Sequence, residues 1–391
     1  MENPPVPLSS ESVTPSWVSQ VLRTKISGHD FQKETNIQSG SGFLSSMVRL
    51  RCEAEDGQNF NIIVKLLPED STMLELTVSE GFDKTEVNFY KEVGPDLLKI
   101  LPDLKQYLCH SYYGHIQHAD EEKHLKYASV LVMEDLKPQG YYTINFAAEE
   151  SMAQFREVLE FMAKFHFAGM VLETRKNAKL CQVYDYLQGV SNSGTSMFYE
   201  MAKGGFVEII QLLSDHGLSQ PVIEAYRKMA PHSDSIIKKV QEASKEFACL
   251  IHGDLWSNNC LFNDDPQFHT KIIDWQLLGY KDPNYDVAVT IVSSIPVKQL
   301  TKEKVTESLQ HYYETFVAEC TKSGDPGNLI TRDWDQFSKF FYTWGMSYTM
   351  LWFLMSSDSF SLNIPRLVKI YEFLILEANV HEFILSQVEE V

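Results

Sequence analysis

Two aspartates each follow a short apolar run, and an asparagine follows the first of them. The sequence reads LIHGDLWSNN at residues 250–259 and IIDWQ at residues 272–276. Each apolar run is typical of a buried strand, so both acids are expected at strand ends. Phosphoryl transfer needs a carboxylate that orients the attacking hydroxyl and accepts its proton, and oxygen ligands that hold Mg²⁺. Asp254 suits the first role, and Asn259 and Asp274 suit the second.

The two segments resemble the catalytic and metal-binding segments of the aminoglycoside phosphotransferase and choline kinase group. Within that group, the H-G-D-L-W-x-N-N and I-D-W-Q patterns are those of the ecdysteroid kinase-like family, also called CHK kinase-like. The resemblance runs from about residue 35 to about residue 290, and more loosely to the C-terminus. It implies a kinase-like fold, ATP and Mg²⁺ as cofactors, and a small-molecule hydroxyl as the phosphate acceptor.

The same resemblance implies a nucleotide site upstream. The segment SGSGF at residues 39–43 precedes the first hairpin, so Gly40, Ser41 and Gly42 are expected over the phosphates, although the segment lacks the full G-x-G-x-x-G pattern. Lys65 ends an apolar strand and resembles the lysine that pairs with the α- and β-phosphates. Glu86, on the next helix, resembles the glutamate that positions this lysine.

The segment VLVMEDL at residues 130–136 resembles the strand that leads into a kinase hinge. There the adenine would bond to the main chain, through the carbonyl of Glu134 and the amide of Leu136. His166, His252 and Asp286 match further family positions, and we assign them structural roles.

The sequence also departs from the protein kinases. It has H-G-D in place of H-R-D and D-W-Q in place of D-F-G. Trp256 stands where a protein kinase has a lysine, and no A-P-E segment frames an activation loop. These departures favour a small-molecule kinase.

The acceptor itself stays open at the level of sequence. An aromatic set with helical spacing either packs the core or lines an apolar, flat-ring acceptor site: Phe340, Trp344, Tyr348, Leu351 and Trp352. The family name suggests a steroid-like or other apolar alcohol. The alternatives are a choline or ethanolamine kinase, which would cage a cation with aromatic rings, and a catalytically silent nucleotide-binding protein.

The elements that must position these residues follow from periodicity. A helix is expected from Thr14-Pro15, after a loose N-terminus over residues 1–14. A hairpin is expected over 47–51 and 60–66, a helix over 81–99, and strands over 109–116 and 127–134. Beyond about residue 150 the pattern is mainly helical. The prediction is a two-lobed α+β fold, with residues 1–136 as a small mixed lobe and residues 137–391 as a larger helical lobe.

Bulk properties exclude some classes of partner. The formal net charge is −19, which disfavours binding to nucleic acid or to an anionic membrane surface. The six cysteines form no C-x-x-C pair, and the N-terminus lacks the basic and apolar regions of a secretory signal. We therefore expect reduced thiols and a cytoplasmic location. The sequence gives no indication of an oligomeric state.

Overall fold

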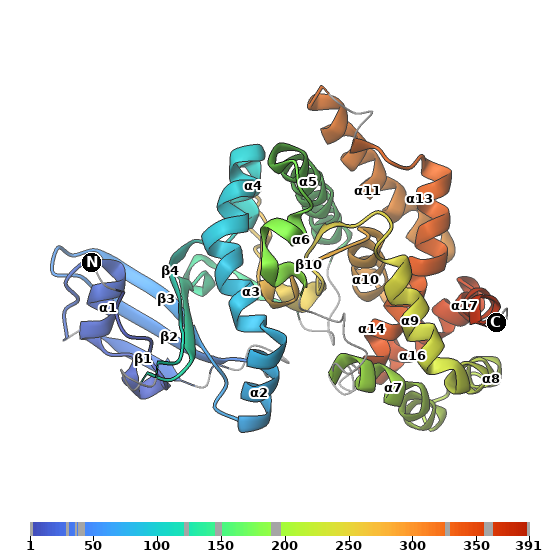
Figure 1. Cartoon of the computed structure of the whole chain (residues 1–391), viewed down its shortest axis with the longest axis horizontal. Helices are drawn as coiled ribbons and strands as arrows, with labels where there is room; N and C mark the ends of the chain where they lie inside the picture. Colours follow the sequence, from blue (N-terminus) through green and yellow to red (C-terminus); the bar gives the residue numbers. More distant parts are fainter. Residues whose placement is uncertain are drawn as a thin grey trace. The chain divides into compact units, whose positions relative to one another are not determined.

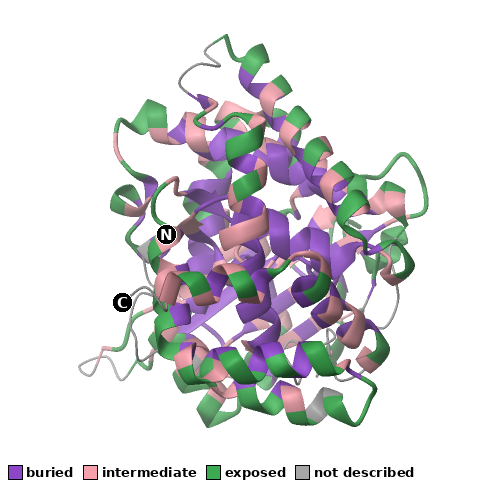
Figure 2. Cartoon of the chain, turned by 90° about the vertical axis from the view of Figure 1, so that its right-hand side faces the viewer, coloured by how far each residue is buried: buried purple, intermediate pink, exposed green. Residues whose placement is uncertain are grey.

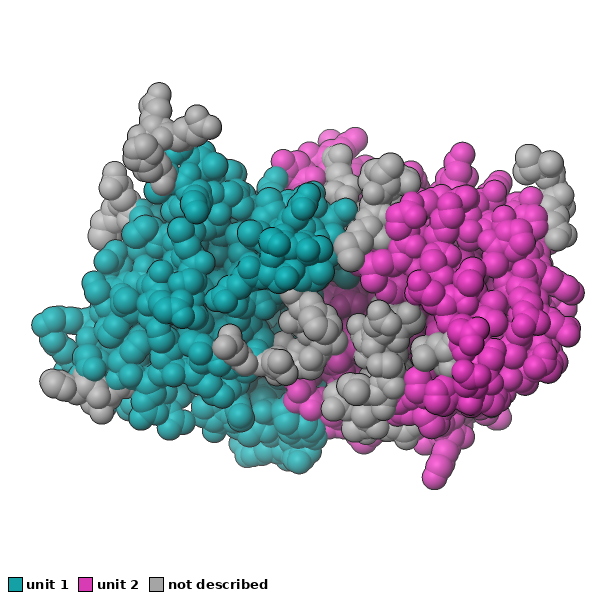
Figure 3. All heavy atoms as spheres, turned by 90° about the horizontal axis from the view of Figure 1, so that it is seen from below, with its two compact units in different colours: residues 1–99, 105–142, 261–277 teal, residues 100–104, 143–260, 278–391 magenta. Residues whose placement is uncertain are grey.

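The computed structural model describes residues 3–28, 31–35, 37, 44–120, 125–144, 151–188, 197–324, 329–355 and 363–388. The chain forms two compact units (Figure 3). Unit 1 contains residues 1–99, 105–142 and 261–277, and unit 2 contains residues 100–104, 143–260 and 278–391. The segment that carries Asp274 therefore groups with unit 1. The boundary between the two lobes that the sequence predicts after residue 136 stays a prediction.

A five-stranded antiparallel sheet forms the centre of unit 1. Its order is β1-β2-β3-β5-β4, with β1 (Gln32–Thr35), β2 (Ser46–Glu53), β3 (Asn59–Leu66), β4 (Ser111–Gln117) and β5 (Ala128–Glu134). The expected hairpin is β2 and β3, and the two further expected strands are β4 and β5. The register places Lys65 of β3 between Met47 of β2 and Leu131 of β5.

The two faces of this sheet differ, because successive side chains of a strand point to opposite sides. Along β3, Ile62 and Val64 are fully buried in a core cluster that includes Trp17 and Val18 of α1 (Pro15–Leu22). Lys65 projects from the opposite face. That face meets α3 (Phe82–Asn88), which packs against β4 and β5 (Figure 1).

The N-terminal segment is held against the sheet. The expectation of a loose N-terminus is wrong for the described residues 3–14, since Val6 and Val13 are buried in the sheet's core cluster. The indole of Trp17 also donates a hydrogen bond of 2.8 Å to the carbonyl of Pro5. Thr14 caps α1 as expected, accepting from the amide of Trp17. Apolar burial outweighs the loop-forming composition of this segment.

The predicted helix over 81–99 is present, but it is interrupted by a π-helical turn. Gly81 ends α2 (Ser71–Glu80) in a left-handed conformation, with a φ of 73°. The chain then continues through α3, a π-helical turn η2 (Phe89–Val93) and α4 (Gly94–Ile100). Short 3₁₀ turns follow at η3 (Pro102–Tyr107) and η4 (Lys137–Gln139), and another, η1 (Ser10–Ser12), precedes α1.

Unit 2 is built from helices around α10 (Asn284–Ser294), in which every residue is buried. Figure 2 shows buried residues gathered on the inner helices and exposed ones on the outer helices. The longest helices are α5 (Met152–Lys176) and α11 (Lys302–Lys322). The others are α6 (Leu180–Val183), α7 (Met197–Ser214), α8 (Gln220–Met229), α9 (Ser233–Ala243), α13 (Trp334–Phe340), α14 (Met346–Met355), α16 (Ile364–Glu372) and α17 (Val380–Val388).

Shorter elements complete the chain. The strands β7 (Cys249–Ile251) and β10 (Gly279–Lys281) pair with each other, and a three-stranded sheet has the order β6 (Tyr142–Thr143), β8 (Cys260–Phe262), β9 (Lys271–Ile272). The single turns are η5 (Asp185–Gln188), η6 (Ala230–His232), η7 (Ser257–Asn259), η8 (Trp275–Leu277), η9 (Val297–Gln299), η10 (Phe341–Gly345) and η12 (Phe373–Glu377).

The expected fold class is confirmed: a kinase-like α+β fold, with a small antiparallel sheet in one unit and mainly helices in the other. The apolar stretch at 340–355 is helical, through α13, η10 and α14. No helix among the described residues is long and apolar enough to cross a membrane. All six cysteines are free thiols.

Candidate active site

Unit 1 brings three of the predicted site residues together. The ammonium of Lys65 lies 2.7 Å from Oε2 of Glu86 and 3.1 Å from Oδ1 of Asp274. The side chains of Lys65 and Glu86 are only 11% and 3% exposed, whereas that of Asp274 is 31% exposed. The lysine is therefore a buried cation between two carboxylates, one of which reaches solvent.

The charge of Lys65 is secured by these partners. Burial by itself would lower the pKa of this lysine, but the carboxylates of Asp274 and Glu86 outweigh burial and raise the pKa above its ordinary value. Lys65 is thus a permanent cation at neutral pH. A buried ammonium group that is always charged and is held in one position is suited to binding phosphate oxygens.

Asp274 reaches the lysine because of an unusual backbone conformation. Its φ is 65°, in the left-handed region that only a few non-glycine residues adopt. The next residue, Trp275, begins η8 and stacks on Phe89 of η2, with ring centroids 3.7 Å apart and planes 10° apart. This stack fixes η8 against the helix that carries Glu86. Backbone strain of this kind is often found at functional sites.

The end of β5, where the sequence predicts the hinge, also lies in unit 1. Leu136 is 3% exposed and belongs to an apolar cluster with Cys109 and Tyr141, against which Leu261 and Ile273 pack. Glu134 is held by its neighbours, because its Oε1 accepts from the amide of His110 at 2.7 Å. The cluster offers an apolar surface beside main-chain groups, which suits a flat base. Gly40, Ser41 and Gly42 lie outside the described residues.

Unit 2 contains the other two predicted residues, Asp254 and Asn259, in direct contact. The amide nitrogen of Asn259 donates to Oδ2 of Asp254 at 2.8 Å and to the Asp254 carbonyl at 2.7 Å. Both bonds use the nitrogen, so they fix which way the amide group faces and turn its oxygen away from the carboxylate. That oxygen is the atom suited to a hard cation.

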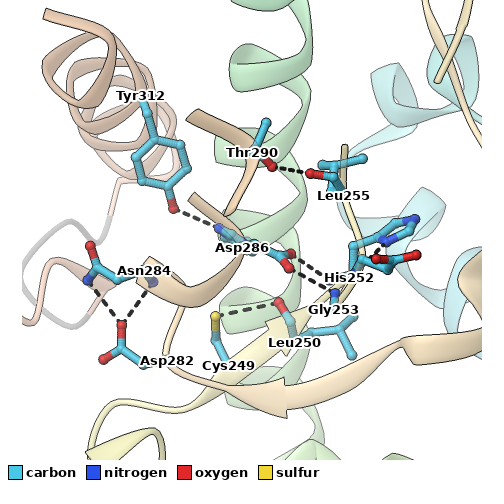
Figure 4. A network of polar contacts seen from close by, with 12 residues as sticks. Cys249, Leu250, His252, Gly253, Leu255, Asp282, Asn284, Asp286, Thr290 and Tyr312 are labelled. Carbon is cyan, nitrogen blue, oxygen red and sulfur yellow. Dashed lines mark hydrogen bonds and ion pairs between the residues drawn. The ribbon is translucent and has the colours of Figure 1, made fainter. Parts of the chain in front are cut away.

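The loop that carries Asp254 is fastened by Asp286 of α10. The Asp286 carboxylate accepts from the amide of His252 at 2.6 Å and from the amide of Gly253 at 2.8 Å (Figure 4). Gly253 has a φ of 86°, which a larger residue adopts only with strain, so the glycine of H-G-D is required by the turn. The imidazole of His252 in turn accepts from the amide of Asp254 at 3.3 Å.

Asp286 is itself held in place by side chains of α5 and α11. His166 of α5 lies between Tyr312 of α11, at 2.7 Å, and Asp286, at 3.3 Å. Burial would raise the pKa of Asp286, but the hydrogen bond with His166 and the electrostatic effect of the two neighbouring histidines keep it below its ordinary value. The two histidines are completely buried. They brace the loop, which agrees with the structural roles predicted for all three residues.

The structure adds one residue that the sequence did not single out for this contact. The indole Nε1 of Trp352, in α14, donates to Oδ1 of Asp254 at 3.2 Å. The ring of Trp352 also meets Trp256 in an edge-to-face contact, with centroids 5.6 Å apart. In the sequence, Trp352 was one of five candidates that either pack the core or line the acceptor site, and no pattern distinguished it.

A sequence model of the ecdysteroid kinase-like family matches residues 39–324. The chain belongs to this family. Its membership supports small-molecule kinase activity and confirms the resemblance seen in the HGDLWSNN and IDWQ segments. No curated protein sequence matches the chain.

Solved structures similar to this ecdysteroid kinase-like protein include three small-molecule kinases. An ethanolamine kinase of Plasmodium vivax has 13% identity and a TM-score of 0.42, and the alignment covers 87% of this chain and 82% of that one. A choline kinase of Streptococcus pneumoniae has 13% identity and a TM-score of 0.35, with coverage of 85% and 94%. An aminoglycoside phosphotransferase of Streptomyces rimosus, solved with ADP and streptomycin, has 14% identity and a TM-score of 0.40, with coverage of 78% and 90%.

Each unit of this ecdysteroid kinase-like protein contains a donor atom that suits magnesium. Asp274 of unit 1 has a partly exposed carboxylate and Asn259 of unit 2 an amide oxygen, and both are hard oxygen ligands. In the part of the chain that the structure describes, no three His, Cys, Asp or Glu residues gather as a metal site. Magnesium in phosphotransferases takes one or two protein ligands and completes its shell with phosphate oxygens and water, so it needs no such cluster.

The other aromatic candidates of 340–352 have different contact partners. The guanidinium carbon of Arg332 lies 4.3 Å from the ring centroid of Phe340. Trp344 meets Phe383 edge to face, with ring centroids 4.9 Å apart. Tyr348 stacks on Tyr285 at 4.2 Å. Of this set, Trp352 is therefore the member with a described hydrogen bond to Asp254.

Proposed function

We propose that the protein is an ATP-dependent small-molecule O-kinase that phosphorylates a hydroxyl group. One observation carries the proposal: Lys65 lies between Glu86 and Asp274, at 2.7 and 3.1 Å. These three residues lie far apart in the sequence, and the family resemblance predicts a nucleotide or metal role for each of them. Two ion pairs on one buried lysine are a costly arrangement to keep for stability alone.

The residues of unit 1 would bind the nucleotide. Lys65 would pair with the α- and β-phosphates, while Glu86 holds the lysine in position. The main chain at Glu134 and Leu136 would bond to the adenine, over the apolar surface that Leu136 shares with Ile273. Asp274 would exchange its contact with Lys65 for a metal-bound position beside the phosphates.

The residues of unit 2 would carry the chemistry. Asp254 would accept a hydrogen bond from the acceptor hydroxyl, aim its oxygen at the γ-phosphate and take its proton. Asn259 would keep the Asp254 carboxylate in place through Nδ2 and present Oδ1 to the metal. Bound Mg²⁺ would neutralise charge that develops on the phosphate oxygens.

For the acceptor we propose a steroid-like or other apolar alcohol. The support is membership of the ecdysteroid kinase-like family and the aromatic side chains beside Asp254, where Trp352 and Trp256 meet edge to face. With six free thiols, we further propose a reducing, cytoplasmic setting.

The test has a binding arm and a transfer arm. Binding of Mg-ATP should raise the melting temperature, with about 2.7 kcal/mol of stabilisation at 100 times Kd. Radiolabelled ATP is then offered with a panel of hydroxylated steroids, apolar alcohols, choline, ethanolamine and an aminoglycoside, with Asp254→Asn as the inactive control. Transfer to choline or ethanolamine alone would replace the proposed acceptor. Tight binding of Mg-ATP without transfer or ATP hydrolysis would indicate a silent nucleotide-binding protein.

A further inference from the structure

Both oxygens of the Asp254 carboxylate accept a hydrogen bond, and the two donors come from different parts of unit 2. Asn259, on the same loop, donates to Oδ2 at 2.8 Å. Trp352, in α14, donates to Oδ1 at 3.2 Å. A carboxylate held at one oxygen can still turn about its Cβ–Cγ bond, whereas one held at both oxygens has a single orientation. Trp352 therefore supplies the restraint that Asn259 alone cannot.

Trp352 is itself firmly placed. Its side chain is 4% exposed, and its ring makes edge-to-face contacts with Trp256 at 5.6 Å and with Phe353 at 5.1 Å. The helix that carries it lies directly against α7: a Cβ atom added at Gly205 would come within 2.5 Å of the Leu354 carbonyl. Close contact between these two backbones limits movement of α14, and with it the position of the indole N–H.

We propose that Trp352 is a positioning residue for the catalytic carboxylate. Its indole N–H is a donor only, so the bond to Oδ1 fixes the orientation of the Asp254 carboxylate. This inference rests on the proposed catalytic role of Asp254, and it makes α14 part of the catalytic machinery.

Two substitutions separate the hydrogen bond from the packing. Trp352→Phe keeps most of the ring and removes the N–H, whereas Trp352→His keeps a ring N–H and loses volume. Turnover is measured as Mg-dependent ATP hydrolysis, which needs no acceptor other than water. We expect Trp352→Phe to lower kcat by about 10-fold, since hydrogen bonds to charged groups are among the stronger ones. The KM for Mg-ATP should change little.

The split between kcat and KM gives a readout that a general loss of packing would not give. A carboxylate that is no longer held at Oδ1 slows the transfer step, whereas the binding of Mg-ATP does not depend on its orientation. Trp352→His should retain more activity than Trp352→Phe. If the histidine variant is the weaker one, or if Trp352→Phe raises the KM for Mg-ATP as much as it lowers kcat, the positioning role is wrong.

Trp17→Phe is the matched control. It removes an indole hydrogen bond of 2.8 Å to the Pro5 carbonyl from a side chain that is 5% exposed, in unit 1. The chemical change is the same as in Trp352→Phe, at a site with no proposed catalytic role. We expect wild-type kcat and an unchanged KM for Mg-ATP. An equal loss of turnover in Trp17→Phe would assign the effect at Trp352 to general destabilisation.

A spectroscopic arm keeps this inference separate from the proposed function. The chain has six tryptophans, so a protein with ¹⁵N-labelled indoles gives few signals, and Trp352→Phe identifies the signal of Trp352 by its loss. Asp254→Asn should shift that signal and leave the Trp17 signal in place. This result supports the contact even in a protein without phosphotransfer, whereas an unmoved signal would overturn the contact whatever the activity.

Discussion

The side-chain amide of Asn259 donates two hydrogen bonds to Asp254, one to the carboxylate at 2.8 Å and one to the main-chain carbonyl at 2.7 Å. The asparagine therefore clamps the loop on which the carboxylate stands, as well as the carboxylate itself. A base that is already oriented needs no reorganisation when the acceptor binds. Such positioning is a main contribution of the protein to phosphoryl transfer.

The first prediction concerns Asp254→Asn. This change keeps the shape of the side chain, removes the base and places an NH₂ group opposite one of two donors. Turnover should fall by roughly 10²–10⁴-fold, the usual cost of losing a general base, while the Kd for Mg-ATP changes much less. Steady-state kinetics and calorimetric titration measure the two effects. Wild-type turnover on a verified acceptor would remove Asp254 from the chemistry.

The second prediction concerns the left-handed backbone at Asp274. Asparagine tolerates a φ of 65° better than alanine does. Both Asp274→Asn and Asp274→Ala should lose phosphotransfer and Mg²⁺ dependence, because each removes a charged oxygen ligand. Asp274→Ala should also be less stable than Asp274→Asn, by about 1 kcal/mol. Activity at wild-type level in either variant would exclude Asp274 from the metal site.

The third prediction tests the buried cation of unit 1. Lys65→Met leaves Glu86, whose side chain is 3% exposed, without its partner at 2.7 Å. Breaking a buried pair on one side typically costs ~3–5 kcal/mol, whereas replacing both members by apolar residues costs far less. We therefore expect Lys65→Met to be less stable in urea than the double variant Lys65→Met with Glu86→Met. Both should lack phosphotransfer.

The control for this cycle is the exposed pair Lys25–Glu55 in the same unit, with side chains 77% and 55% exposed. Lys25→Met should change stability little, because exposed ion pairs are screened by water. If Lys65→Met is no less stable than Lys25→Met, the ion pair of Lys65 with Glu86 does not stabilise unit 1 as a buried pair should.

Much of unit 1 follows from local pattern. The period-2 alternation that predicted the hairpin is the same alternation that buries Val64 and turns Lys65 to the other face. The π-helical turn η2 was not predictable, because it depends on packing between Phe89 and Trp275 and not on the propensity of its own residues. Asp274 was predicted as a ligand from its motif, but not its positive φ.

The site was predictable where residue type and short spacing carry the information, as with Asp254 and Asn259. It was not predictable where a contact joins distant segments. Trp352 lies on a helix whose spacing also fits core packing, and the ring is in fact packed as a core residue would be. Only its single polar atom meets Asp254, and hydrophobic periodicity contains no information about that atom.

The last prediction concerns Lys281 of β10, which lies over the ring of Tyr348 at 5.4 Å from the centroid. Burial lowers its pKa to about 8, although the charge of Asp286 acts in the opposite direction. An unfolded lysine has a pKa of about 10.4. Between these two values the unfolded chain binds more protons than the folded one, so the contribution of Lys281 to stability becomes more favourable as pH rises through this window.

Lys281→Met should therefore gain stability relative to wild type at pH 7, and this gain should shrink as the pH approaches 10. Urea unfolding of both proteins across that range measures the difference, and an exposed lysine of the same unit, changed as Lys238→Met, gives the baseline. A difference between Lys281→Met and wild type that does not vary with pH would show that Lys281 titrates alike in the folded and unfolded chains.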